Sequence, residues 1–111
     1  MKRLYNAFFY SLAGIRAAWS DEPAFRLECI LATILIPLAC VIQPPGVELA
    51  LMVSSVLLVL LVELLNSAIE AAIDRISKDQ HELSKKAKDC GSAAVLTAII
   101  TAVITWLFIL L

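Results

Sequence analysis

Glycine is scarce in this sequence, which has Gly14, Gly46 and Gly91 as the only three among 111 residues. Glycines so far apart exclude GxxxxGK[ST] and GxGxxG, the loops with which many soluble enzymes bind nucleotide phosphates. Charge is scarce too, since 17% of the residues are charged, and nine basic residues nearly balance ten acidic ones. The net charge of -1 indicates neither the basic surface of a nucleic-acid-binding protein nor an acidic tail.

Cysteine is present in an odd number and without regular spacing. Cys29, Cys40 and Cys90 lie in or beside apolar sequence, where a free cysteine commonly behaves as a small hydrophobic residue. We therefore assign these cysteines no role in metal binding or catalysis.

Apolar residues are abundant. They make up 61% of the chain, and the mean hydropathy is +0.90. Soluble domains contain about 45–50% apolar residues. The composition therefore predicts a membrane protein, and the length allows one domain, 1–111.

Three apolar stretches predict three transmembrane helices. Residues 29–42 are short for a span of about 20 residues but can be extended by their neighbours, 49–62 follow a QPPGVE turn, and 93–111 form the clearest span. We expect an all-α membrane protein. Its predicted helices cover 3–20, 27–43, 48–75 and 88–111.

The basic residues indicate the orientation. All of them lie before the first span or between the second and third spans: Lys2, Arg3, Arg16, Arg26, Arg75, Lys78, Lys85, Lys86 and Lys88. Because an excess of lysine and arginine marks the cytoplasmic side, we expect a cytoplasmic amino terminus and an outward-facing carboxyl terminus.

The segment 3–19 is amphipathic. One helical stripe carries its apolar residues: Leu4, Phe8, Leu12, Ile15 and Trp19. A helix with aromatic anchors and basic residues tends to lie in the membrane interface, so we predict a surface helix. The alternative is a cleaved signal peptide, but polar residues such as Asn6 and Arg16 interrupt any apolar core of that kind.

Four polar residues, Glu63, Asn66, Glu70 and Asp74, form what we call the acidic stripe. Their steps of 3, 4 and 4 return to one helix face, within an arc of roughly 80°. Ionisable groups near membrane depth are costly and are therefore functional-site hypotheses. The alternative is structural, with Asn66 bonding between helices of an oligomer and the acids solvated beyond the interface.

Two more polar clusters lie on the same side, SDEPAFRLE at 20–28 and KKAKDCGSAA at 85–94. Structural explanations exist for both, because Asp21 before Pro23 can cap a helix and Asp89 favours a helix amino terminus. Helix packing explains the small residues of the second cluster and its continuation: Gly91, Ser92, Ala93, Ala94, Ala98 and Ala102.

The three clusters place several charged side chains at one cytoplasmic interface: Glu22, Glu28, Glu63, Glu70, Asp74, Lys88 and Asp89. Carboxylates beside a lysine suit a magnesium ion that bridges phosphate oxygens, because Mg²⁺ commonly uses one or two carboxylates plus substrate phosphates. From the residues alone we predict a metal-dependent site for an anionic substrate, with an enzymatic role left open.

The stretches RAAWSDEPAFRLE (16–28), VELLNSAIEAAIDRI (62–76) and AKDCGSAAV (87–95) resemble the prokaryotic diacylglycerol kinase family, and the resemblance covers nearly the whole chain. It implies a surface helix and three transmembrane helices in a homotrimer of the bacterial inner membrane, with sites shared between subunits. It also implies transfer of the γ-phosphoryl group of MgATP to a lipid hydroxyl, diacylglycerol giving phosphatidic acid, without a kinase-type nucleotide fold.

The resemblance also implies roles for individual residues. Glu63 is the expected general base, with Asn66 beside it, and Glu22 and Glu70 are expected to hold Mg²⁺. The expected nucleotide contacts are those two acids together with Lys88, Asp89, Tyr10, Asp74, His81 and Glu82. The expected lipid contacts are Glu63, Arg16, Trp19, Glu28 and Ser92, and Arg3 is a candidate for either substrate.

Three other functions remain open at this point, and the last of them is a purely structural membrane subunit. A close relative phosphorylates undecaprenol, whose hydroxyl also lies at the interface, and we prefer diacylglycerol because of the GSAAV and IDRIS neighbourhoods. The alternative from another class is a small oligomeric transporter in which Glu63 carries a proton or cation. The outer halves of the spans have no ionisable group except Glu48, which disfavours transport.

Overall fold

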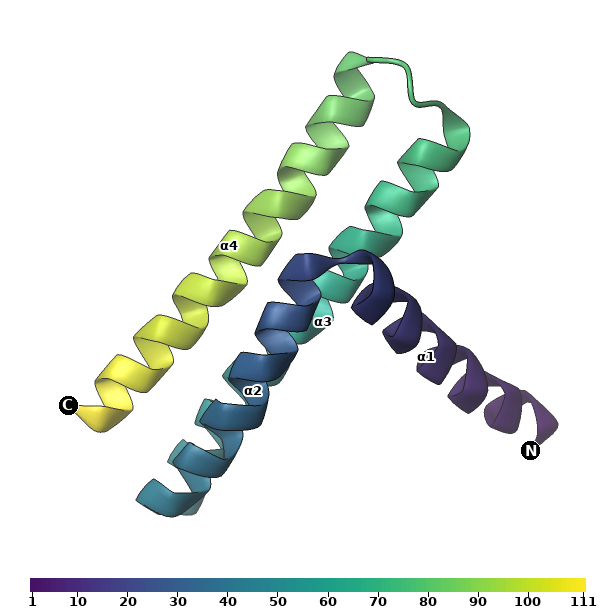
Figure 1. Cartoon of the computed structure of the whole chain (residues 1–111). Coiled ribbons are helices and arrows are strands. Elements are labelled where there is room, and N and C mark those ends of the chain that lie inside the picture. The colour runs from purple at the N-terminus through teal and green to yellow at the C-terminus, as the bar shows by residue number, and fades with distance from the viewer.

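The computed structural model describes residues 1–111 and contains four helices and no strand. They are α1 (Lys2–Asp21), α2 (Pro23–Ile42), α3 (Gly46–Ile76) and α4 (Glu82–Leu110). Figure 1 shows α3 and α4 as a long antiparallel pair, with α1 leaving the other helices at an angle. The predicted all-α fold is confirmed.

Helix α3 is the centre of the molecule, because it packs against the other three helices while α2 and α4 do not contact each other. Its buried residues follow steps of three and four along one face: Met52, Ser55, Val56, Val59 and Glu63. Small residues seven apart are buried opposite it, Ala32 and Ala39 on α2 and Gly91 and Ala98 on α4. Small side chains allow close approach of helix backbones, so the core is a narrow seam along α3.

Helices α2, α3 and α4 are each long and apolar enough to cross a membrane, as expected. At 1.5 Å per residue the 31 residues of α3 measure about 46 Å, against about 30 Å for a bilayer core. The helix therefore exceeds one span by several turns. Its polar end carries the acidic stripe.

All four helices begin earlier than predicted, and the differences are largest for α2 and α4. Helix α2 begins at Pro23 rather than 27, because proline suits the first helical position and Glu22 before it is extended, with φ of -118°. Asp21 is thus the last residue of α1 and not the cap of α2. Helix α4 begins at Glu82 rather than 88, because His81 Nδ1 caps it by accepting a hydrogen bond from the Leu83 N–H at 3.1 Å.

The other predicted ends differ less. Helix α3 begins at Gly46 instead of 48, and α2 ends at Ile42, one residue early, because Gln43 is left-handed with φ of 55°. Helix α1 exceeds the predicted 3–20 by one residue at each end, and only Ala18 of its side chains is buried. Its position in the membrane interface stays a prediction.

The α3–α4 pair has two ends that recur below. The loop end is the end joined by residues 77–81, and the far end is the opposite one. At the far end, Trp106 Nε1 donates to the Met52 carbonyl and to Ser55 Oγ, both at 3.2 Å. Ser55 Oγ in turn donates to the Met52 carbonyl at 2.7 Å, so this contact between α3 and α4 is fully hydrogen-bonded.

Candidate active site

The acidic stripe runs from the core of the molecule to its surface. Glu63 is 5% exposed and belongs to the buried seam of α3. Asn66 and Glu70, one and two turns further, are half-buried, and Asp74 is exposed. The predicted stripe therefore joins a buried carboxylate at the apolar part of α3 to solvent near the loop end.

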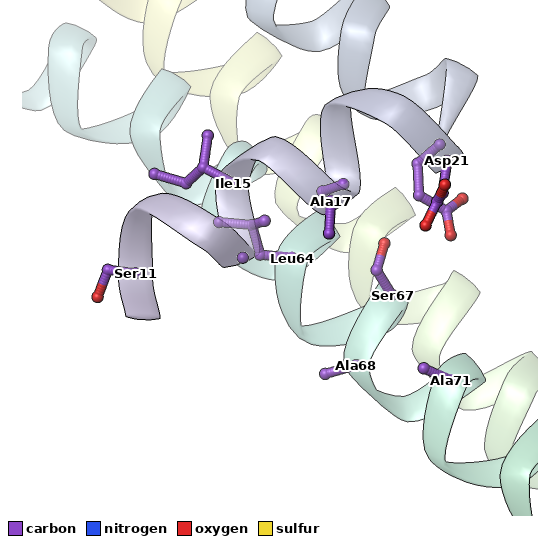
Figure 2. A pocket seen from close by; sticks show the side chains of 11 residues that line it. Ser11, Ile15, Ala17, Asp21, Leu64, Ser67, Ala68 and Ala71 are labelled. Atoms are coloured by element: carbon purple, nitrogen blue, oxygen red, sulfur yellow. The ribbon is translucent and has the colours of Figure 1, made fainter. Parts of the chain in front are cut away.

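Glu22 lies at the corner between α1 and α2. Its half-buried side chain lines a cleft of about 500 Å³ between α1 and α3, to which α3 contributes Ser67 and Ala71 (Figure 2). Arg26 fixes the corner, because its Nη1 donates to the carbonyl of Trp19 at 2.8 Å and to that of Ser20 at 3.2 Å. The cleft thus lies beside α3 at the level of the acidic stripe.

Four carboxylates converge around this point. Glu22 and Glu70 both repel the charge of Glu63, and Glu63 repels that of Glu28. Carboxylates held close together repel one another, which is costly unless a bound proton or cation neutralises part of their charge. The cluster is therefore arranged to receive positive charge.

Buried oxygen atoms without partners lie in the same region. They are Glu28 Oε1, Asn66 Oδ1 and Ser67 Oγ. Buried polar atoms are normally hydrogen-bonded, so three exceptions beside a carboxylate cluster indicate a site for a ligand. No three Asp, Glu, His or Cys side chains could together hold a metal ion. A metal here would need oxygen ligands from a substrate or another subunit.

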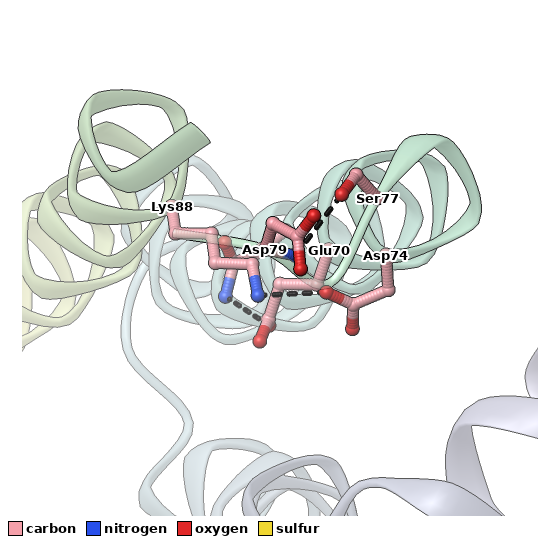
Figure 3. A network of polar contacts seen from close by, with 6 residues as sticks. Glu70, Asp74, Ser77, Asp79 and Lys88 are labelled. Carbon is pink, nitrogen blue, oxygen red and sulfur yellow. Dashed lines mark hydrogen bonds and ion pairs between the residues drawn. The ribbon is translucent and has the colours of Figure 1, made fainter. Parts of the chain in front are cut away.

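One hydrogen bond lies within the stripe, and one ion pair connects it to α4 (Figure 3). Asn66 Nδ2 donates to Glu70 Oε1 at 3.1 Å, and Lys88 Nζ of α4 lies 2.8 Å from Asp74 Oδ1. Lys88 precedes the apolar part of α4, and its hydrogen bond with Asp74 raises the pKa of its ammonium group above the usual value. Lys88, which also interacts electrostatically with Glu70, is therefore cationic at neutral pH.

A polar pocket of about 280 Å³ occupies the loop end. Four predicted nucleotide residues line it: Asp74, His81, Lys88 and Asp89. Lys85 lines it as well and pairs with Asp89, with 2.7 Å between Nζ and Oδ2. Lys78 is the third lysine in the lining, and three lysines at the end of a stripe of acids suit a phosphate-bearing ligand that brings its own cation.

Comparison with known proteins identifies the family. The model of prokaryotic diacylglycerol kinase matches residues 9–110. The chain is 52% identical to diacylglycerol kinase of Escherichia coli (strain K12) over 108 residues, which are 97% of this chain and 88% of the relative. The chain belongs to the prokaryotic diacylglycerol kinase family. This confirms the resemblance in the sequence motifs.

Other relatives in the diacylglycerol kinase family are about as similar. Diacylglycerol kinase of Pseudomonas aeruginosa is 51% identical over 111 residues, with 100% of this chain and 90% of the relative covered. That of Haemophilus influenzae is 50% identical over 106 residues, with 96% and 90% covered. Because these relatives match nearly end to end, the family assignment rests on the whole chain rather than on a single motif.

Within one chain, the structure does not bring every candidate of the diacylglycerol kinase family to the acidic stripe. Six are exposed, do not line the pocket at the loop end that Asp74 lines, and form no side-chain hydrogen bond or ion pair with the stripe: Arg3, Tyr10, Arg16, Trp19, Glu82 and Ser92. By contrast, Glu22, Glu28 and Lys88 interact electrostatically with residues of the stripe. Their roles all stay predictions.

Sequence reasoning missed the part played by two residues. The sequence pattern marks Arg26 only as a positive charge, although a basic residue just after a helix end is suited to bind the last carbonyls of that helix. Gly91 was explained by general helix packing, but it faces Asn66 specifically. Among the small residues of α4 that were assigned to helix packing, Gly91 and Ala98 are buried within the chain whereas Ala94 is exposed.

Proposed function

We propose that the chain is an integral-membrane lipid kinase that transfers the γ-phosphoryl group of ATP to the hydroxyl of diacylglycerol. The observation that carries this is the acidic stripe, which joins buried Glu63 to the lysine-lined pocket at the loop end. The lipid hydroxyl comes from the bilayer and the nucleotide phosphate from the aqueous solution, and the stripe extends from one to the other. The relatives named diacylglycerol kinase support the same activity.

Glu63 is the general base of this proposal. It lies at the apolar end of the stripe, so a lipid hydroxyl can reach its carboxylate without leaving the bilayer. Glu63 takes the hydroxyl proton as the oxygen bonds to the γ-phosphorus. The bond between that phosphorus and the ADP oxygen breaks, giving phosphatidic acid and ADP.

Glu22 and Glu70 would hold Mg²⁺, which would supply positive charge to offset that of the nucleotide phosphates. Both acids fit this role, because Glu22 lines the cleft and Glu70 presents a carboxylate fixed by Asn66. Having only a few carboxylates suits Mg²⁺ that arrives with ATP. Asn66 therefore orients the Glu70 carboxylate and lies one helical turn from the base, Glu63.

The nucleotide phosphates are proposed to lie against Lys88, whose ammonium group offsets charge that builds up during transfer. Lys88 then exchanges its Asp74 partner for phosphate oxygens. Asp89, His81 and Glu82 are proposed as further nucleotide contacts, since they lie in or beside the pocket at the loop end. The lipid is proposed to enter along α1, near Arg16 and Trp19, and Glu28 of α2 and Ser92 of α4 are proposed as further lipid contacts.

We further propose a homotrimer whose sites are shared between subunits. Its support is that α2 and α4 do not contact each other, which leaves apolar faces of α3 and α4 for neighbouring subunits and lipid. Tyr10 and Arg3, distant from the stripe in one chain, would reach a site of another subunit. The basic residues support a multi-pass protein of the bacterial inner membrane with a cytoplasmic amino terminus and an outward carboxyl terminus.

The test uses purified protein in mixed detergent and lipid micelles with MgATP labelled on the γ-phosphorus. Dioleoylglycerol and undecaprenol are supplied in separate reactions, and labelled lipid is measured. We expect phosphatidic acid to form faster than undecaprenyl phosphate. Faster labelling of undecaprenol would reassign the substrate, whereas no labelled lipid in either reaction would reject the kinase. Glu48→Gln is the matched control, because this acid lies at the far end of α3.

A further inference from the structure

Gly91 lies where α4 comes close to the acidic stripe. It is one of the two buried residues of α4. A Cβ atom added to it would lie 3.1 Å from Asn66 Cγ and collide outright with Asn66 Oδ1. No other residue type can therefore occupy position 91 while the Asn66 amide stays in place.

The Asn66 amide uses its two ends differently. Its Nδ2 donates to Glu70 Oε1 at 3.1 Å, whereas its Oδ1 is buried, has no hydrogen-bond partner and faces Gly91. A buried oxygen normally turns toward a donor. Here the oxygen instead lies against α4 at Gly91.

We propose that Gly91 is a positioning residue, which leaves room for Asn66 Oδ1 and thereby keeps Nδ2 directed at Glu70. Glu70 is placed in turn for the metal-bearing phosphates, so the effect of Gly91 on turnover rests on the proposed function. Its effect on the Asn66–Glu70 hydrogen bond does not.

A methyl group at position 91 would displace the amide rather than the helix. The atoms it meets belong to the end of a side chain, whereas α3 and α4 are also fixed to each other at Ala98 and Trp106. The asparagine amide can leave its position by rotation about χ2 or by a change of the χ1 rotamer, and either movement carries Nδ2 away from Glu70. Alanine also favours a helix more than glycine does, so Gly91→Ala keeps or raises the unfolding temperature.

The amide can be observed directly, because Asn6 and Asn66 are the only asparagines of the chain. Labelling asparagine with ¹⁵N gives two side-chain NH₂ signals in the NMR spectrum of the full chain in micelles, with exposed Asn6 as the internal reference. We expect Gly91→Ala to move the Asn66 signal and leave that of Asn6. Glu70→Gln should move the Asn66 signal in the wild-type background but not in the Gly91→Ala background.

Turnover is measured on the same samples. We expect Gly91→Ala to lower kcat roughly 10- to 100-fold, because a misplacement of about 1 Å has effects of this size. The control is Cys90→Ala, at the exposed neighbouring position, which should retain both kcat and the Asn66 signal. Adding Gly91→Ala to Asn66→Ala should not change the unfolding temperature by more than its effect on helix propensity.

Three results would overturn the proposal. They are an unmoved Asn66 signal in Gly91→Ala, wild-type kcat despite a moved signal, and loss of folding in Gly91→Ala that persists with Asn66→Ala. Lack of kinase activity in the wild-type protein would reject the proposed function instead, and the NMR comparison would still test the contact.

Discussion

The two ends of the α3–α4 pair are held together in opposite ways. At the far end, Trp106, Ser55 and Met52 satisfy one another by hydrogen bonds. Towards the loop end, Gly91 packs against an amide whose oxygen has no partner, beside carboxylates that repel one another. One end is arranged for stability, and the other gives up stability to keep polar groups available for ligands.

Apart from the proposed base Glu63, the largest effect should come from replacing Glu70, which repels Glu63. Glu70→Gln removes a proposed Mg²⁺ ligand, so we expect kcat to fall about 100-fold or more and the Mg²⁺ requirement to rise. Because the substitution also removes repulsion of Glu63, the unfolding temperature should be retained or raised. Activity is measured against Mg²⁺ concentration. A lower unfolding temperature with normal activity would make Glu70 a structural residue.

Arg26 tests whether the corner between α1 and α2 matters for activity. Arg26→Gln loses the hydrogen bonds to the Trp19 and Ser20 carbonyls, so Glu22 is no longer held at the cleft. We expect kcat to fall about tenfold, with a higher Mg²⁺ requirement, and Arg26→Lys to recover part of the loss. An unchanged Mg²⁺ dependence in Arg26→Gln would show that Arg26 does not position Glu22 for Mg²⁺ binding.

The far end should show the reverse behaviour. Trp106→Phe keeps an aromatic ring but removes the Nε1 donor, so the free energy of unfolding should fall by about 1 kcal/mol. Activity per folded molecule should be unchanged, since this contact is remote from the acidic stripe. The comparison uses denaturant unfolding in micelles, with Phe108→Leu as the exposed control on the same helix. A large loss of kcat in folded Trp106→Phe would show that the ends are coupled.

The smallest effect is expected at the exposed pair of Lys85 and Asp89. Exposed ion pairs contribute little, so Lys85→Ala should leave the unfolding temperature unchanged within error. The hydrogen bond with Asp89 raises the pKa of Lys85, which means that any contribution is complete below the usual lysine pKa of about 10.4 and is lost only above it. Unfolding temperatures of Lys85→Ala and wild type should therefore run parallel from pH 6 to pH 9. A difference between the two unfolding temperatures that changes within this pH range would indicate that Lys85 has a partner other than Asp89.

The spans, the acidic stripe and the family could be predicted because each can be recognised within continuous segments of the sequence. Hydropathy marks α2, α3 and α4, and steps of three and four place Glu63 and Glu70 on one face. The contact of Gly91 with Asn66 could not be predicted, because it depends on how far α4 is shifted along α3. The start of α4 was missed for a local reason, since the cap at His81 is a single side-chain hydrogen bond within a charged stretch.

The measurement that tests the account most directly is the turnover of dioleoylglycerol by Glu63→Gln, made beside thermal unfolding of the same sample. Glutamine has nearly the shape of glutamate but cannot accept the hydroxyl proton, so we predict loss of nearly all turnover. The unfolding temperature should be at least that of the wild type, because the repulsion with Glu22, Glu28 and Glu70 disappears. Wild-type turnover in a folded Glu63→Gln protein would contradict the account.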